Sequence, residues 1–189
     1  MTPEEIGSTL TELFDPANVQ AIAPESWQIE TSGYRLLVIL SEDHFWLRVL
    51  LPIMPAQTAQ PFIEQLLKAN FDDTKQTRYA MHQDVLWGVF QHTCESLVKS
   101  DFSDALAQLI SLHKLGLSDA FNQLVESRMR QIIKVAKQQG QSFESTLQNL
   151  DRSYEEGLLG DLEQGAESRE QVLAAWRRRL ESLWPEVEL

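Results

Sequence analysis

The most chemically suggestive stretch of the chain is 76–92, QTRYAMHQDVLWGVFQH, which has a histidine near each end and an aspartate and a tryptophan between them. Histidine and carboxylate side chains are common metal ligands and proton carriers. The pattern predicts two strands joined by a two-residue turn at Gln83-Asp84. His82 then pairs with Val85, and His92 lies about 23 Å further along the second strand at about 3.3 Å per residue. Because metal ligands lie about 2 Å from their ion, these histidines cannot share one.

No other set of reactive side chains is typical of an enzyme. His44 and His113 lack a ligand-like neighbour at two or four residues, and His113 is expected to be a hydrogen-bonded histidine at the core edge. The carboxylate pairs Glu42-Asp43, Asp72-Asp73 and Glu155-Glu156 have no histidine beside them and are expected to be solvated. Phosphate-binding glycine loops, GxSxG and HExxH are absent from the sequence. We therefore expect no catalytic residue, no metal and no cofactor.

Composition limits the partners. The 189 residues include 28 acids and 16 bases, a net charge of −12. The acids are in excess in both halves, 13 against 6 bases in residues 1–100 and 15 against 10 in residues 101–189. Such a surface repels phosphate backbones and anionic lipids, which predicts no nucleic-acid binding. The longest apolar run, LLVIL at 36–40, is too short to span a bilayer, so no membrane insertion is expected.

The single cysteine and the first residues indicate the compartment. Cys94 cannot form an internal disulfide and is expected to be a buried thiol in a reducing compartment. The first residues, MTPEEIGSTL, lack the basic-then-apolar pattern of a signal peptide. We expect a cytoplasmic protein.

The first half of the chain alternates helical and strand-like segments. Thr2-Pro3-Glu4-Glu5 predicts a capped helix. Three strand-like runs follow, and their short linkers predict an antiparallel meander: WQIE (27–30), YRLLVIL (34–40) and HFWLRVLL (44–51). Pro52 and Pro55 are expected to end the sheet, and a helix is expected at about 59–70.

Alternation sorts the strand residues onto two faces. In the second strand of the hairpin, Val85, Trp87 and Val89 share one face, opposite to Phe90. Gly88 lies on the Phe90 face and indicates the close approach of a bulky side chain or of another backbone. Two interpretations stay open: the alternation is that of a sheet core packed against a helix, or one face is an exposed apolar surface that awaits a partner. The candidate partner-binding residues are Trp46, Trp87 and Phe90.

The second half is predicted to be helical. One helix ends at Gly116, and another runs from Ser118 to about Lys137. Arg130, Lys134 and Lys137 share a face of the latter, either as a basic docking face or as cations that balance a helix C-terminus. Residues 142–166 are polar and acidic with three glycines, and a last helix is expected from Ser168.

The order helix, three strands, helix, strand pair, helix over 3–115 resembles the class I type III secretion chaperones and the YbjN-like proteins. The likeness is greatest at 62–114, with an LLxxN helix end at Leu66–Asn70. The sequence of this segment most resembles an uncharacterised cyanobacterial group of that fold. The resemblance implies a small, acidic, dimeric and non-catalytic protein that binds extended segments of other proteins along apolar grooves. Residues 118–189 add helices beyond those of a typical secretion chaperone.

We therefore predict an α+β fold in which a curved antiparallel sheet packs on helices, with a chaperone-like domain at 1–117 and a helical extension at 118–189. The predicted function is a non-catalytic protein-binding module, chaperone- or assembly-factor-like, that holds a partner polypeptide and forms a homodimer. The alternative is a small ligand-binding domain or enzyme with a cleft between the sheet and the C-terminal helices, using His82, His92 or Asp84.

Overall fold

The computed structural model describes residues 1–155 and 166–188. The chain divides into two compact units, Met1–Phe121 and Asn122–Leu189. The elements of the first unit are α1 (Pro3–Leu13), a 3₁₀ turn (Pro16–Asn18), β1 (Val19–Ala23), β2 (Ser26–Glu30), β3 (Arg35–Leu40), β4 (Trp46–Pro55), α2 (Ala56–Ala59), a second 3₁₀ turn (Gln60–Phe62), α3 (Ile63–Asp72), β5 (Thr77–His82), β6 (Val85–Thr93), α4 (Lys99–Leu115) and the start of α5 (Ser118–Gln138).

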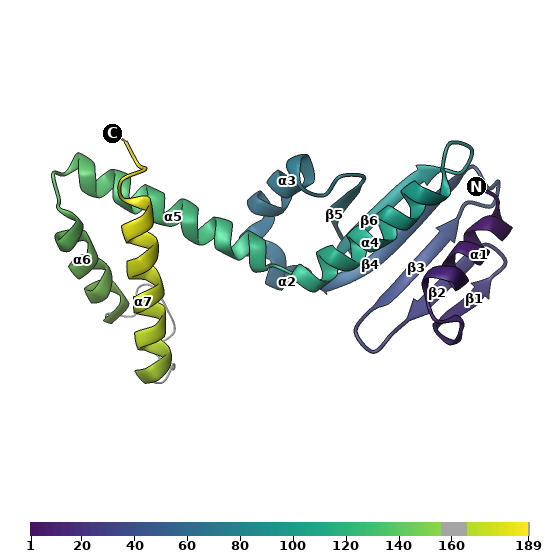
Figure 1. The fold of residues 1–189 in the computed structure, drawn as a ribbon, viewed down its shortest axis with the longest axis horizontal. Coiled ribbons are helices and arrows are strands. Elements are labelled where there is room, and N and C mark those ends of the chain that lie inside the picture. Colours follow the sequence, from purple (N-terminus) through teal and green to yellow (C-terminus); the bar gives the residue numbers. More distant parts are fainter. Residues whose placement is uncertain (156–165, 189) are drawn as a thin grey trace. The chain divides into compact units, whose positions relative to one another are not determined.

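The strands of the first unit form one antiparallel sheet in the order β1-β2-β3-β4-β6-β5, which confirms the predicted α+β fold (Figure 1). The meander predicted for the first three runs is β2, β3 and β4. The edge strand β1 was not predicted, because VQAIA contains two alanines and a glutamine and shows no clear alternation of apolar residues.

Helices α1 and α4 cover one face of the sheet. The capping box that was predicted at Thr2 and Glu5 begins α1: the Thr2 N–H donates to Glu5 Oε2 (2.8 Å), and the Glu5 N–H donates to Thr2 Oγ1 (3.3 Å). Apolar residues form the core beneath these helices, and its fully buried members include Ile6, Leu10, Ile29, Leu36, Val38, Leu47, Val49, Leu51, Phe102 and Leu109.

The hairpin of β5 and β6 has the predicted register, with Met81 opposite Leu86 and His82 opposite Val85. Both turn residues, Gln83 and Asp84, have positive φ, as two-residue hairpin turns require. A Cβ atom at Gly88, opposite Tyr79, would lie 3.1 Å from Cδ2 of Leu109 on α4. The predicted close approach at Gly88 is therefore confirmed.

Pro52 does not end the strand, contrary to the prediction, because β4 stays paired with β6 and runs on to Pro55, where it ends. The pairing of β4 with β3 ends at Leu50, so the other edge of β4 has no strand partner from there on. Proline is tolerated on such an edge, where its missing N–H interrupts no ladder. The ring nitrogens of His113 lie 3.1 Å from the carbonyl oxygens of Pro52 and Gly33, which confirms His113 as a hydrogen-bonded histidine.

The helix expected at 59–70 is shifted and broken. Pro61 lies in the 3₁₀ turn that separates α2 from α3, and α3 continues to Asp72. Proline lacks the N–H that an uninterrupted helix needs, so the chain starts a new helix after it.

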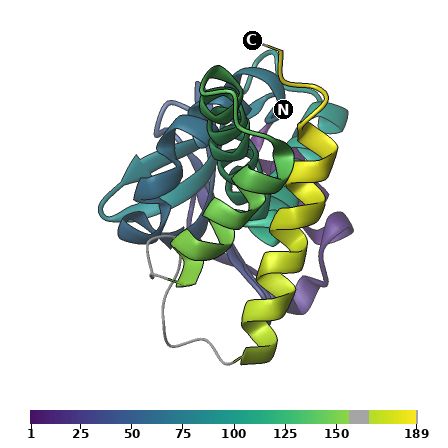
Figure 2. The ribbon, with the colours of Figure 1, turned by 90° about the vertical axis from the view of Figure 1, so that its left-hand side faces the viewer.

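The second unit consists of the rest of α5 with α6 (Phe143–Glu155) and α7 (Ala166–Leu183). Helices α6 and α7 lie side by side in opposite directions (Figure 2). Together with α5 they enclose a small core: Met129, Ile133, Leu147, Leu150, Leu180 and Leu183. No helix was predicted at α6, although Phe143, Leu147 and Leu150 repeat at helical spacing within its polar sequence.

Candidate docking surface on the free face of the sheet

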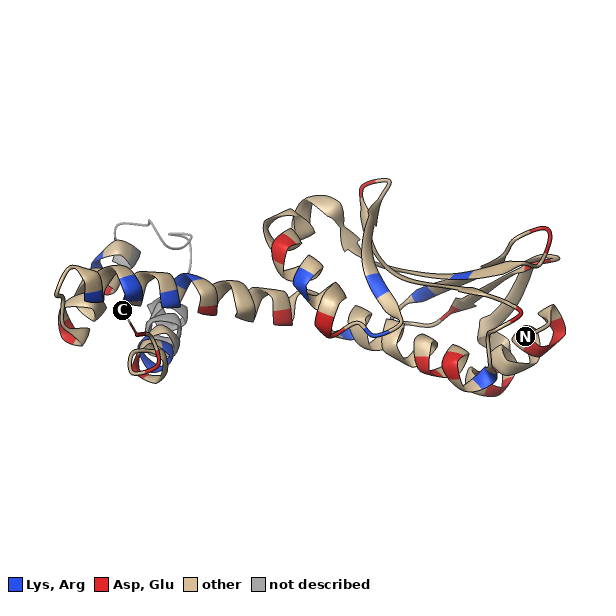
Figure 3. Ribbon diagram, turned by 90° about the horizontal axis from the view of Figure 1, so that it is seen from above, with Lys and Arg blue, Asp and Glu red and all other residues tan. Residues whose placement is uncertain are grey.

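The two faces of the sheet have different surroundings. The face under α1 and α4 carries residues that are fully buried, such as Val38 and Val49. No helix of the first unit covers the opposite face of β3, β4 and β6 (Figure 3). Most of its residues are half-buried, whereas Val89 is only 6 % exposed and Gln91 is exposed. We call this surface the free face, and it consists of Leu37, Ile39, Trp46, Arg48, Leu50, Trp87, Val89 and Gln91.

The register arranges the free face in rows across three strands. One row is apolar, with Leu37 opposite Leu50 and Leu50 opposite Val89. The next row places Ile39 opposite Arg48, and Arg48 opposite Gln91. Since residues on one face of a strand lie two positions apart, these rows are neighbours. The free face is therefore an apolar surface with a single cation near its centre.

The charges of the strands contrast with the charge of the whole chain. The six strands contain four charged residues other than histidine, and the register places all four on the side opposite to α1 and α4: Glu30, Arg35, Arg48 and Arg78. Arg35 pairs with Glu30 at 2.6 Å, which leaves two arginines. Most acids of the chain lie on helices and in loops (Figure 3). A positive apolar face thus lies on a protein of net charge −12.

Arg48 is held in place by its neighbours. Its Nε and Nη2 donate hydrogen bonds of 3.1 and 2.9 Å to Oε1 of Gln91. Its guanidinium carbon lies 5.0 Å from the ring centroid of Trp46, within the range of a cation–π contact. Both neighbours are uncharged, and no carboxylate of the described residues forms an ion pair with Arg48. The cation is fixed in position without being neutralised.

The three predicted partner-binding residues lie on different faces. Trp46 and Trp87 are on the free face and half-buried, and the indole N–H of Trp87 donates to the carbonyl of His82 (3.0 Å). Phe90 is only 1 % exposed and lies on the other face, in the core under α4. The alternation of β6 assigned Phe90 to that face, but it could not tell which face the helices cover. Sequence reasoning also missed Gln91, because its pairing with Arg48 depends on the register of strands that are 43 residues apart.

The predicted basic residues of α5 form contacts within the second unit. Arg130 donates to Glu126 and Glu186, at 3.1 and 2.6 Å, and these hydrogen bonds raise the pKa of Arg130. The Nζ of Lys137 donates to the carbonyls that follow α7, at Trp184 and Val187. Lys134 is exposed. Two of the three cations are thus engaged by their own unit.

The residues of the enzyme alternative do not converge. His82 and Asp84 lie at the tip of the hairpin of β5 and β6, whereas the ring of His92 stacks on Phe90 at 5.9 Å. Within 1–155 and 166–188, no group of three or more His, Cys, Asp or Glu residues is arranged to hold a metal ion. Cys94 is buried as expected, and burial raises the pKa of its thiol, which keeps it protonated and unreactive.

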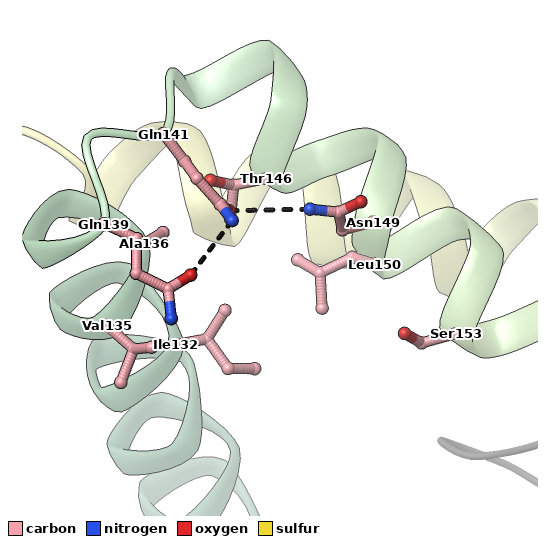
Figure 4. A pocket seen from close by; sticks show the side chains of 9 residues that line it. All are labelled: Ile132, Val135, Ala136, Gln139, Gln141, Thr146, Asn149, Leu150 and Ser153. Carbon is pink, nitrogen blue, oxygen red and sulfur yellow. Dashed lines mark hydrogen bonds between the residues drawn. The ribbon is translucent and has the colours of Figure 1, made fainter.

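A hollow of about 200 Å³ lies between α5 and α6 in the second unit (Figure 4). Its lining includes Ile132, Val135 and Leu150 together with side-chain amides, and none of the nine lining residues is titratable. Gln141 links the amides, since it donates to Gln139 (3.1 Å) and accepts from Asn149 (3.5 Å). The hollow has no acid or base for catalysis. In the part of the chain that the structure describes, no helix is long and apolar enough to cross a membrane.

Comparisons with known proteins find similarity in structure alone. No family model matches the chain, and no curated protein sequence matches it. A chain in the crystal structure of the ExsC–ExsE complex has a TM-score of 0.46 at 11 % identity, over 60 % of this chain and 95 % of that chain. A chain in the HopA1–SchA chaperone–effector complex has a TM-score of 0.42 at 10 % identity, over 59 % and 95 %.

A third similar structure is the heterodimeric complex ExoU–SpcU from the type III secretion system of Pseudomonas aeruginosa. Its TM-score is 0.42 at 14 % identity, over 50 % of this chain and 82 % of that chain. Of these three structures, the second is a chaperone–effector complex and the third belongs to a type III secretion system. At these scores the likeness supports no conclusion about function. The likeness to YbjN-like proteins and to a cyanobacterial group stays a prediction.

Proposed function

We propose that this chain is a non-catalytic, cytoplasmic protein-binding module, chaperone- or assembly-factor-like, that holds a partner polypeptide against the free face. The observation that carries this proposal is the apolar centre of the sheet, which no helix of the first unit covers, with Trp46 at one end and Trp87 at the other. Large apolar residues on an open face lower the free energy of binding when a partner removes them from water. Tryptophan and arginine are also enriched among the residues that dominate binding energies.

The chemistry of the free face selects the class of partner. The cations on this side of the sheet, Arg48 on the free face and Arg78 opposite Val89, do not suit a nucleic acid, because the rest of the chain carries an excess of acids that repels a phosphate backbone. A second copy bound face to face would bring Arg48 and Arg78 against equally positive surfaces. A polypeptide with apolar residues and carboxylates matches both the apolar rows and the charge.

The test uses a displayed library of random peptides, panned on the immobilised full chain. We expect enrichment of peptides rich in large apolar residues, and loss of their binding in Trp46→Ser and Trp87→Ser at an unchanged thermal midpoint. The matched control is Phe45→Ser, which removes an aromatic residue that is 57 % exposed and precedes β4 but lies off the free face. Retained binding in both tryptophan variants would overturn the proposal, as would equal loss in the control.

We also propose that the module forms a homodimer through α3. Leu67 and Phe71 lie one turn apart on α3 and are 63 % and 88 % exposed. Beside them, Lys68 pairs with Glu64 at 2.7 Å. In a two-fold antiparallel pair of α3 helices, each acid can approach the lysine of the other copy, so this surface is self-complementary. A second copy is therefore the occupant that fits this surface.

Sedimentation of the full chain at micromolar concentration tests the homodimer. We expect a dimer for the wild type and a monomer for Phe71→Ser, whereas Phe45→Ser stays dimeric. A wild-type monomer at these concentrations would contradict the proposal for α3 and would leave the free face unaffected.

A further inference from the structure

We infer that Arg48 binds a carboxylate of the partner, so that the bound segment carries an aspartate or glutamate between apolar residues. The inference rests on the proposed function and names the chemistry of its partner. It follows from three properties of Arg48: its unused donors, its surroundings on the free face and its position along β4.

The first property is the set of donors that Gln91 leaves unused. A guanidinium has five N–H donors, and Nε and Nη2 of Arg48 use the edge that they share to bind Oε1 of Gln91. The Nη1–Nη2 edge keeps its donors. Two parallel N–H groups on that edge match the two oxygens of a carboxylate. Gln91 therefore orients Arg48 without using the edge that recognises an acid.

The second property is the environment of the charge. Arg48 lies over the ring of Trp46 and next to the apolar row that Leu50 joins. A partner that covers these apolar neighbours also removes water from the guanidinium. Leaving an arginine dehydrated without an anion is costly, whereas a paired and hydrogen-bonded carboxylate compensates for that loss. An acidic residue is thus required of any segment that covers the apolar rows fully.

The third property fixes the order of side chains in the partner. Trp46, Arg48 and Leu50 follow one another along β4 at every second residue. An extended segment laid along β4 has the same repeat, because alternate side chains of a strand point to one face. The acid that binds Arg48 is then flanked, two residues away on each side, by apolar residues that contact Trp46 and Leu50. The expected motif is apolar-x-acid-x-apolar.

The experiment compares the peptides that a random displayed library yields on the full wild-type chain with those from Arg48→Gln. We expect the motif on the wild type, and apolar peptides without a preferred acid on R48Q. The matched control is Arg128→Gln, which removes an equal charge from an exposed position in the second unit. The control should yield the wild-type motif. Thermal midpoints of all variants establish that each is folded.

A double-mutant cycle then measures the interaction energy between Arg48 and the acidic residue of the peptide. One enriched peptide is synthesised with its acid and with the matching amide, and both are titrated by fluorescence anisotropy. We expect R48Q and the amide peptide each to weaken binding about tenfold, and both changes together to weaken it no further, since charged pairs at interfaces are coupled by about this much. Arg48→Lys should bind less tightly than the wild type, because an ammonium lacks the planar pair of donors.

The outcomes separate the inference from the proposed function. Apolar peptides that carry no preferred acid and bind R48Q equally well would overturn the role of Arg48 and leave the docking function intact. Displacement of the peptide by inorganic phosphate, with no effect of the amide substitution, would also overturn it. Peptides that bind both Trp46→Ser and Trp87→Ser as well as the wild type would overturn the docking function itself.

Discussion

Asn70 and Tyr79 exchange two hydrogen bonds at the edge of the sheet. Nδ2 of Asn70 donates to the carbonyl of Tyr79 (3.1 Å), and the N–H of Tyr79 donates to Oδ1 of Asn70 (2.7 Å). A side-chain amide thus occupies the backbone groups that a further strand would use. Asn70 is the last residue of the LLxxN segment, so that segment has a structural role at the edge strand β5.

Replacing Asn70 by alanine is expected to destabilise the protein by about 1–2 kcal/mol, because the N–H and C=O of Tyr79 lose their partners. Denaturant unfolding of the full chain measures the change. Asn122→Ala, an exposed asparagine at the start of the second unit, should stay within about 0.5 kcal/mol of the wild type. An Asn70→Ala protein as stable as the wild type would show that water replaces the two hydrogen bonds to Tyr79 without loss of stability.

Gly88 makes a second measurable prediction. Leu109 lies so close to this position that Gly88→Val is expected to cost about 1–3 kcal/mol through overpacking against α4. Gly33→Ala is the matched control, since no atom lies within 4 Å of its added Cβ. The double variant Gly88→Val with Leu109→Ala should be more stable than the sum of its single changes predicts. Additive effects would mean that Gly88 and Leu109 are not in contact.

The parts of the fold that the sequence predicted are those set by local patterns. Alternation identified β2, β3 and β4, and the hairpin at Gln83-Asp84 followed from a turn between two alternating runs. The same alternation placed Trp46, Arg48 and Leu50 together on one face. Local periodicity is enough for such assignments because neighbouring strands are joined by short linkers.

The parts that the sequence did not predict depend on distant contacts. Which face the helices cover decides that Phe90 is core and Trp87 is not, and this needs the position of α4. Pro52 continues a strand because the pairing of β4 with β3 stops at Leu50, which depends on the neighbouring strand and not on proline. The role of Lys137 likewise depends on a distant segment, because the residues after α7 supply the carbonyls that it binds.

Lys137 and Lys134 distinguish a structural from a docking role for the basic face of α5. The ammonium of Lys137 donates to Trp184 and Val187, both at 2.7 Å, and lies 5.4 Å from the ring centroid of Trp184. Lys137→Met should therefore cost about 1.5–3 kcal/mol, since hydrogen bonds of charged groups are the stronger ones. The exposed Lys134→Met should cost less than about 0.5 kcal/mol. Equal stabilities, measured in urea by circular dichroism, would contradict a structural role for Lys137.

Tyr79 is expected to lower the stability of the protein at alkaline pH, and a single substitution should change this effect. Burial raises the pKa of Tyr79, and the nearby charges of Asp119 and Asp73 raise it further. An unfolded tyrosine ionises near a pH of about 10. Below that pH the phenol is neutral in both states and the stabilities do not depend on it. As pH rises through 10 towards the higher pKa of the folded state, the unfolded state releases the proton first, and stability is lost.

Tyr79→Phe removes this proton, so its stability should fall less steeply than that of the wild type above pH 10, whereas the two curves run parallel at lower pH. Asp119→Asn removes one of the charges that raise the pKa of Tyr79 and should give a slope between the two. Unfolding midpoints in urea at a series of alkaline pH values measure the slopes. Identical slopes for the wild type and Tyr79→Phe would show that Tyr79 ionises equally easily in both states, and that its phenol is open to solvent.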